Sequence, residues 1–332
     1  MSITDTPQVF GKSLDLLMQR RDHVDCGEKV PKIIRLAANS LYNHTFTVRL
    51  SNNRNSLAPP NNNNNNNSDP NQSSSSSSAS SSGRWLGLKV DGIFRESGSA
   101  MRLQEMRELF DRGPDAIEEL TRMQYVNNVF DLEDPHVTAN MIKLYLRLLP
   151  EPIMTFGAYD RIIRLVHSMD SSLSSSPSSS GNDASLTGAN RLHFVQEVKQ
   201  MLRELPPNNE KLLNTVLFLL YECHTVNDRM KASNLGIVFG VNLFRSPSQQ
   251  QQNGGGGGGG GGETEQQHAH NIQYLNRATQ WLIELYHEFF TGTEPYLFTI
   301  YQPLLRRRVI LQSCVNELEK ESRNPMVAQK AN

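Results

Sequence analysis

One short segment of the sequence places a charged side chain in a setting suited to chemistry. The segment reads Gly92-Ile93-Phe94-Arg95-Glu96-Ser97-Gly98. Ile93 and Phe94 are expected to anchor it in a core. Ser97 and Gly98 are small and leave space beside Arg95. A guanidinium held rigidly on such a loop can stabilise negative charge that develops on a phosphate oxygen. The alternative is a solvated arginine that follows a buried Ile-Phe pair.

A second pair of positive charges shares one face of a predicted helix. Lys143 and Arg147 are four residues apart, and they are the only charges between Asp134 and Glu151. Side chains at this spacing project from the same side of a helix. The guanidinium of Arg147 can also donate several fixed hydrogen bonds to loop carbonyls. The alternative is an ordinary solvated stripe.

The motifs of a self-sufficient enzyme are absent from the sequence. There is no GxxxxGK[ST] phosphate loop, no HExxH and no GxSxG. The 9 histidines form no cluster at metal-ligand spacing. Cys26, Cys223 and Cys314 lie far apart without a CxxC pair, so they indicate neither a zinc site nor a disulfide framework. We therefore expect the chain itself to hold no metal and no cofactor.

Charge and hydropathy give no support for a nucleic-acid partner, a signal peptide or a membrane-spanning helix. Lys and Arg number 33 against 34 for Asp and Glu, so the net charge is −1 and nothing favours nucleic acid as a partner. Residues 1–10 lack the pattern of a signal peptide. No apolar stretch approaches the roughly 20 residues of a membrane-spanning helix. The sequence predicts a cytoplasmic protein without a transmembrane segment.

Three low-complexity tracts interrupt the chain: 51–83 is rich in Asn and Ser, 171–190 in Ser, and 247–270 in Gln and Gly. Such composition cannot bury enough apolar surface to offset chain entropy, so we expect disorder there. Each tract falls between helical segments, which indicates insertions into one domain. The first tract ends shortly before Arg95. A gating or phosphorylation role is one interpretation of it; a tolerated expansion without a role is favoured.

Between the tracts the apolar residues recur at helical spacing. Helices are predicted from Pro31 onward and at 101–112, 134–149, 153–169, 192–204, 208–226 and 271–290. Asp134 followed by Pro135 is a typical helix start, and Pro150 and Pro152 end that helix. Residues 230–245 contain Ile237, Val238 and Phe239, which favour a strand by propensity. We predict a helix there, because no sheet partner exists. The expected fold class is all-α.

Three separated segments together resemble the RhoGAP family. The first is the Arg95 segment. The second reads KLYLRLLPEP over 143–152, and the third reads NLGIVFGVNL over 234–243. The family pattern is GIFR-x-SG, then K-x-x-x-R-x-LP-x-P, then NLA-x-VFGPNL, in the same order. LPPNN at 205–209 also looks like the family. The resemblance runs from about Phe10 to about Phe290.

The resemblance implies a single RhoGAP-type helical bundle over 10–290, with a tail at 1–9 and an extension at 291–332. It implies a GTPase activator that is not itself an enzyme. The partner would be a Rho-family small GTPase in its GTP form, which carries the GTP and Mg²⁺ and receives Arg95 in trans. One alternative is a RhoGAP-like module that binds a GTPase as a scaffold or effector without activating it. Another is a helical adaptor with no GTPase partner.

The resemblance also assigns roles to the other residues. Lys143 would face the GTPase, Arg147 would brace the loop of Arg95, and Asn242 would contact the switch regions of the GTPase. Val241 stands where the family usually has proline, which would stiffen a turn before Asn242, and Gly236 stands where alanine is usual. Asn234 fits better as a helix cap or a buried amide.

Near the C-terminus, Pro303 to Glu321 combines three consecutive arginines with apolar residues. A docked terminal helix is favoured there. Contact with acidic lipid, which would be a peripheral membrane contact, or with a partner helix is the alternative.

Overall fold

The computed structural model describes residues 9–20, 30–43, 87–124, 128–173, 186, 188–247 and 265–290. Within these ranges every regular element is helical, so the fold class is all-α, as the sequence predicts. The homopolymers of the three tracts and the segment from Pro303 to Glu321 lie outside the described residues. The predictions made for them are therefore not addressed by the structure.

The described residues contain the following α-helices, in chain order. They are α1 Leu14–Met18, α2 Lys32–Asn43, α3 Ala100–Arg112, α4 Pro114–Met123, α5 Pro135–Leu148, α6 Tyr159–Leu173, α7 Gly188–Glu204, α8 Pro207–Val226, α9 Ala232–Leu243, α11 Glu265–Glu284 and α12 Tyr286–Phe289. Two 3₁₀ helices, η1 Val129–Leu132 and η2 Phe156–Ala158, lie before α5 and α6.

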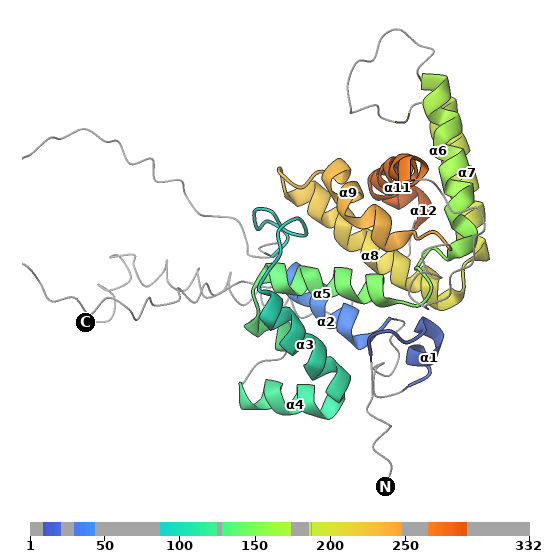
Figure 1. The fold of residues 1–332 in the computed structure, drawn as a ribbon. Helices are drawn as coiled ribbons and strands as arrows, with labels where there is room; N and C mark the ends of the chain where they lie inside the picture. The colour runs from blue at the N-terminus through green and yellow to red at the C-terminus, as the bar shows by residue number, and fades with distance from the viewer. Residues whose placement is uncertain are drawn as a thin grey trace, which may run out of the picture.

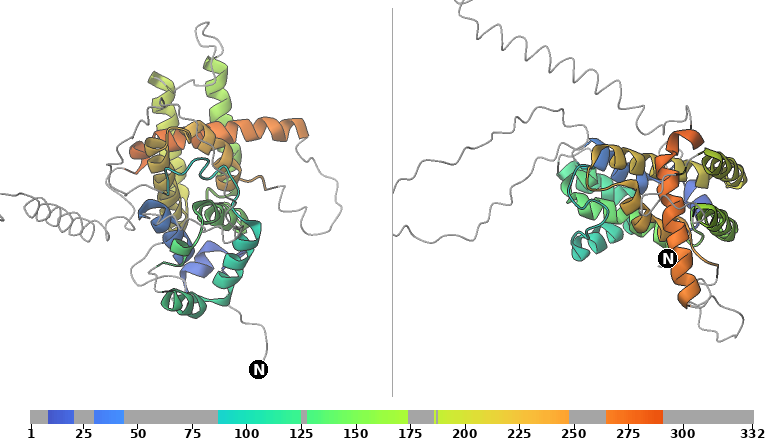
Figure 2. Two further views of the ribbon diagram at one scale, coloured as in Figure 1. Left: turned by 90° about the vertical axis from the view of Figure 1, so that its left-hand side faces the viewer. Right: turned by 90° about the horizontal axis from the view of Figure 1, so that it is seen from above.

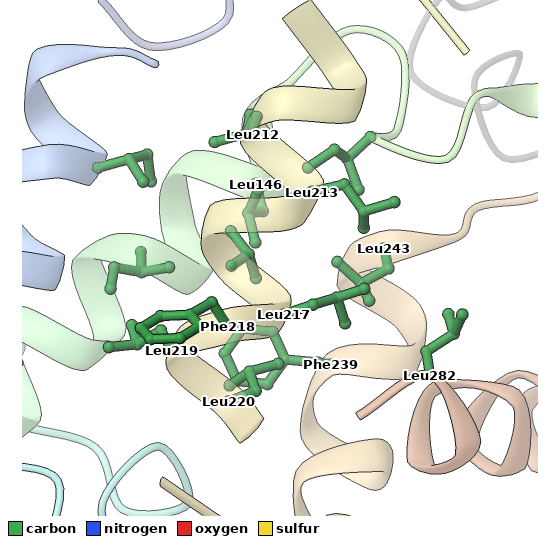
Figure 3. Packing of buried hydrophobic residues seen from close by; sticks show 14 of the residues in the cluster. Leu146, Leu212, Leu213, Leu217, Phe218, Leu219, Leu220, Phe239, Leu243 and Leu282 are labelled. Atoms are coloured by element: carbon green, nitrogen blue, oxygen red, sulfur yellow. The ribbon is translucent and has the colours of Figure 1, made fainter. Parts of the chain in front are cut away.

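Helix α8 forms the centre of the bundle. It is buried on nearly every side; Leu212, Leu213, Val216, Leu217 and Leu220 are at most 1% exposed. A helix that is apolar all round belongs in a core. Figure 3 shows its leucines between Leu146 of α5 on one side and Leu243 and Phe239 of α9 on the other.

The remaining helices pack around this centre in two groups (Figures 1 and 2). Helices α3 and α4 lie at one end beside α5, which also contacts α2. Helices α6 and α7 form a hairpin at the other end, and α11 crosses between α9 and α6. The segment 87–98 runs between the two groups, next to α5 and α9.

Most of the predicted helices are confirmed with small shifts of their ends. The Asp134 carboxylate accepts a hydrogen bond from His136 N at 2.7 Å and Pro135 is the first helical residue, as expected for the start of α5. Pro207 likewise opens α8. The helix predicted over 230–245 is α9, and the strand alternative for Ile237 to Phe239 is wrong.

Four predicted helix ends are wrong. The helix predicted from 153 begins only at Tyr159, because Thr155 has φ 60° and Thr155 N bonds Pro152 O at 2.8 Å, which closes a turn. Other helix ends also differ from the prediction: α6 continues to Leu173 rather than 169, α7 begins at Gly188 rather than 192, and α11 begins at Glu265 rather than 271. Gln and Glu are good helix formers, so the polar start of α11 extends the helix beyond its buried part.

Candidate functional site: the loop that carries Arg95

The loop before α3 turns sharply at Arg95. Arg95 N and Glu96 N both donate to Gly92 O, at 2.9 and 2.8 Å. Phe94 has φ 65°, in the left-handed region that bulky side chains rarely adopt. Such a conformation costs on the order of 1–3 kcal/mol and persists only when its surroundings enforce it. The turn buries Ile93 and Phe94 completely and directs the next residue outward.

Packing against helix α9 helps to hold Phe94 in this conformation. The Phe94 ring packs edge-on against Phe239 of α9, with the ring centroids 5.3 Å apart. Both rings are 0% exposed. Edge-to-face pairs of this kind contribute about 0.5–1.5 kcal/mol beyond their area burial. The residue before Arg95 is thereby fixed to the body of the bundle.

Two polar side chains of helix α5 also hold the loop, through hydrogen bonds to its carbonyls. Lys143 Nζ donates to Phe94 O at 2.5 Å, and Asn140 Nδ2 donates to Glu96 O at 3.4 Å. The two donors are three residues apart and share one face of α5. The two carbonyls flank Arg95 in sequence. Its backbone is therefore held on both sides while its side chain is left unconstrained.

The loop lies directly against α5 at Gly98. A Cβ atom at this position would lie 2.6 Å from Val137 N, a distance at which the backbone would have to move. Glycine is thus required for the close approach. Ser99, the next residue, caps α3 by accepting from Arg102 N.

The Arg95 guanidinium is exposed rather than held by the fold. Its side chain is 58% exposed, and its ion pair is with the neighbouring Glu96, Nη2 to Oε1 at 3.4 Å. Exposed pairs of this kind contribute at most about 1 kcal/mol. A phosphate can therefore replace the Glu96 carboxylate at little cost.

Lys143 is a half-buried cation beside this loop. Burial, followed by the positive charge of Arg147, lowers the pKa of Lys143 to about 8. Both causes disfavour the charged form of the ammonium group. The Phe94 carbonyl offsets part of the lost hydration.

The bracing role that the family resemblance gives Arg147 stays a prediction. Among the described residues its exposed guanidinium makes no hydrogen bond to residues 92–98. Lys143, about one turn of helix (about 5.4 Å) before Arg147, is the residue whose side chain bonds the loop, at Phe94 O. The Arg147 carbonyl instead accepts from Arg245 Nη1 at 2.8 Å, and Arg245 Nη2 bonds Leu149 O. Arg245 thus caps the C-terminus of α5, and burial lowers its pKa.

Asn242 lies in the last turn of α9. It is 8% exposed, and its Nδ2 donates to Val238 O of the same helix at 2.6 Å. Val241, which stands where the family usually has proline, is a helical residue, 42% exposed, because α9 continues to Leu243. Asn242 is connected to the Arg95 loop through Phe239, which lies three residues earlier on α9.

Comparison with known proteins decides the family. The model of the RhoGAP domain matches residues 85–248, which contain the Arg95 loop, α5 and α9. The chain contains a RhoGAP domain.

Relatives of this RhoGAP domain are named as Rho GTPase-activating proteins. The chain is 34% identical over 167 residues to Rho GTPase-activating protein 29 of Danio rerio, covering 48% of this chain and 11% of that protein. It is 32% identical over 165 residues to Rho GTPase-activating protein 8 of Mus musculus, covering 49% and 31%. The chain therefore spans less than a third of the length of these relatives. The crystal structure of human Rho GTPase activating protein 15 has the same fold, with a TM-score of 0.51 at 17% identity over 86% of this chain and 93% of that one.

Sequence reasoning missed Asn140 in this RhoGAP domain. Asn140 is 9% exposed on a helix face that also carries Lys143 and Arg147. A polar residue three positions before Lys143, on a helix otherwise crowded with apolar residues, was the available signal. Asn234 is neither the N-cap of α9 nor a buried amide: it is the third residue of the helix, and its Nδ2 donates to Arg229 O at 2.9 Å.

The described part of the RhoGAP domain offers no group of three or more His, Cys, Asp or Glu side chains arranged to hold a metal ion. Across those same residues, no helix has the length and apolar character needed to cross a membrane.

Proposed function

We propose that this chain is a GTPase-activating protein for a Rho-family small GTPase in its GTP form. Arg95 would enter the nucleotide site of the GTPase in trans. The GTPase would carry the GTP and Mg²⁺ and orient the attacking water. The presence of a RhoGAP domain and the names of its relatives support the class of partner.

The single observation that carries the proposal is the exposed guanidinium on a fixed backbone. Arg95 is 58% exposed, while the carbonyls before and after it are bound by Lys143 and Asn140. Hydrolysis spreads negative charge over the γ-phosphate oxygens, and an arginine placed there accelerates known GTPases by 10³–10⁵. That range corresponds to about 4–7 kcal/mol of barrier. An arginine fixed before the encounter avoids reorganisation in the transition state.

The remaining site residues are proposed to assist in different ways. Lys143 acts as the brace of the loop, since its ammonium group faces Phe94 O. Arg147 is exposed one turn further along α5 and is the better candidate to touch the GTPase. Asn242 ends α9 beside the loop and is the candidate for the switch regions, although its amide nitrogen already donates to Val238 O.

The test is single-turnover GTP hydrolysis by a panel of small GTPases, with the wild-type chain and Arg95→Ala. Acceleration at saturating chain should fall at least a hundredfold in the variant, while binding to the GTPase loaded with a non-hydrolysable GTP analogue survives. Arg112→Ala removes an exposed arginine from the far end of α3 and serves as the control; it should accelerate like wild type.

Two other outcomes would contradict the proposal. Equal rates for wild type and Arg95→Ala would make Arg95 a surface residue. Binding of a GTPase without acceleration by the wild type would favour a scaffold or effector.

A further inference from the structure

One buried amide is bonded to the chain leading into the Arg95 loop. Asn227 follows the end of α8 and is 5% exposed. Its Nδ2 donates to Leu88 O at 2.8 Å and to Val90 O at 3.1 Å. Its Oδ1 accepts from Arg229 N at 3.0 Å and Met230 N at 3.1 Å. The two donors and two lone pairs of the amide are thus all used.

These four bonds join two segments that are far apart in sequence. Leu88 and Val90 belong to the non-helical stretch before Arg95, whose carbonyls have no helical partner and must find one elsewhere. The turn at 227–230 leads directly into α9, the helix that packs on Phe94. Asn227 therefore fixes both the start of the loop and the start of the helix against which the loop rests.

The connection reaches Arg95 through two consecutive turns. Val90 O accepts from Ile93 N at 3.2 Å as well as from Asn227, and Gly92 O accepts from Arg95 N at 2.9 Å. A shift of Val90 therefore changes the turn from which the guanidinium projects. On the surface, Arg229 also pairs with Asp91, but both side chains are exposed, so this pair adds little.

We infer that Asn227 is a positioning residue for Arg95: it holds the N-terminal part of the loop, as Lys143 and Asn140 hold the carbonyls on either side of Arg95. This inference rests on the proposed function of Arg95. An arginine whose backbone is displaced by about 1 Å loses much of its effect on the transition state, even when the partner still binds. The loss of Asn227 should therefore lower the rate at saturation more than it weakens binding.

The test compares Asn227→Asp with Asn209→Asp. Aspartate at 227 still accepts from the amides of 229 and 230, but it loses both donors and turns a carboxylate oxygen toward two carbonyls. Asn209, in the first turn of α8, is the matched control because it too is a buried asparagine, 8% exposed, that donates to a loop carbonyl, Ile153 O at 2.9 Å. It lies near the opposite end of the helix, about 27 Å away at 1.5 Å per residue.

Two readouts are measured on the full chain. In single-turnover GTP hydrolysis, Asn227→Asp should lower the rate at saturation at least tenfold and change the half-saturating concentration less than threefold. Asn209→Asp should keep the saturating rate within twofold of wild type. In hydrogen exchange, the amides of Arg95 and Glu96 should exchange at least tenfold faster in Asn227→Asp only. If Asn227→Asp fails to fold, Asn227→Ser replaces it, because a serine hydroxyl can still bond the turn at 229–230 but is too short to reach Leu88 and Val90.

Equal exchange at Arg95 and Glu96 in the two asparagine variants would overturn the inference, and so would equal saturating rates. If the wild-type chain accelerates no GTPase, the proposed function fails. The exchange measurement still decides by itself whether Asn227 fixes the loop.

Discussion

At the scale of single residues, an arginine that acts on the nucleotide of another protein meets two opposed demands. Its head group has to remain exposed until the encounter, and its backbone has to be fixed beforehand. Arg95 meets both because its immediate neighbours carry the constraints. Phe94 is buried against Phe239, and the carbonyls of Phe94 and Glu96 are bound by α5. Only the side-chain torsions of Arg95 remain to be ordered on binding, which limits the entropic cost.

The half-buried ammonium of Lys143 predicts a pH dependence of stability. Its pKa is about 8 in the folded chain, against an ordinary value of 10.5. Below pH 8 both states hold the proton; between about 8 and 10.5 the unfolded chain holds a proton that the folded chain has released. The unfolded state then binds more protons, so the free energy of unfolding rises with pH in that window. With solvent screening, the gain should be about 1–2 kcal/mol.

Urea unfolding of wild type and Lys143→Met at several pH values measures this effect. The difference in unfolding free energy between the two should grow in favour of wild type from pH 8 to 10.5. Taking the difference cancels other groups that titrate at high pH, such as Cys223, whose pKa burial raises to about 12. Lys89→Met, at an exposed lysine of the segment that leads to Arg95, controls for the loss of one positive charge. A flat or falling difference would contradict the prediction.

The sequence was sufficient to single out Arg95 and to place Lys143 near the site, because both belong to short contiguous motifs. It was not sufficient for Asn140 and Asn227, whose partners lie 44 and 137–139 residues away along the chain. The bracing role that the resemblance gives Arg147 stays a prediction, since residue spacing defines a helix face but not the height along the helix axis at which each side chain lies. Which of two side chains on one face meets a carbonyl depends on how the helix is docked.

At the scale of elements, α9 is a helix although Ile237, Val238 and Phe239 favour a strand by propensity. Gly236 and Gly240 lie four residues apart and face α11. A Cβ at Gly236 would lie 2.4 Å from Asn276 O, and one at Gly240 would lie 2.4 Å from Asn276 Oδ1. The two helices therefore approach through their backbones, and this packing outweighs the local propensity.

The close contact between α9 and α11 predicts that Gly236→Ala destabilises the chain, even though alanine is the usual residue of the family at this position. Alanine favours a helix over glycine by about 1 kcal/mol, but its Cβ would meet a backbone carbonyl that can move only with α11. Overpacking of this kind costs about 1–3 kcal/mol. The net effect should be a lower urea midpoint at unchanged m-value.

Gly157→Ala is the matched control, since a methyl group there would come no closer than 3.8 Å to Thr155 Oγ1 and the residue is exposed. It should leave the midpoint nearly unchanged. Stabilisation by Gly236→Ala would mean that α9 and α11 separate easily, against the close approach of their backbones.

Helix boundaries were the least predictable part of the elements. Helix α4 was not predicted, although Gly113 and Pro114 form a recognisable start, because Ile117 is its only fully buried side chain. The late start of α6 depends on Phe156 N bonding the Glu151 carboxylate at 3.3 Å, a contact that periodicity does not reveal. Long helices with broad apolar faces were predicted well, since burial of those faces decides their existence.

At the scale of the whole molecule, the core extends beyond the region that matches the family model. Helix α2, before residue 85, buries Ile33, Ile34, Ala37 and Leu41, each at most 1% exposed. Helix α11, after residue 248, buries Ala278, Trp281, Leu282 and Ile283 to the same degree. Both helices pack on elements of the site: α2 on α5, and α11 on α9. Helices α2 and α11, which lie outside the matched region, therefore help to hold the site in place.

This arrangement predicts that a fragment of residues 85–248 does not form a stable fold, whereas residues 9–290 do. The shorter fragment would expose the faces of α5, α8 and α9 that α2 and α11 cover. Each large apolar side chain removed from the interface forfeits about 1.5–3 kcal/mol of burial, so the loss of the isoleucines, leucines and tryptophan of α2 and α11 matches the roughly 5–15 kcal/mol that stabilises a domain. Segment 9–290 also retains the bonds from Val9 N and Phe10 N to the Asp111 carboxylate.

Urea unfolding followed by circular dichroism, with binding of a hydrophobic dye, separates the two fragments. Residues 9–290 should unfold in one cooperative step at the midpoint of the full chain. Residues 85–248 should bind the dye without urea and show a broad transition. Helices can form locally in this fragment, but its core lacks α2 and α11. A cooperative transition of 85–248 at the same midpoint would mean that α2 and α11 contribute nothing to the core. In that case the close packing of α9 on α11 would no longer explain how the Arg95 loop is held.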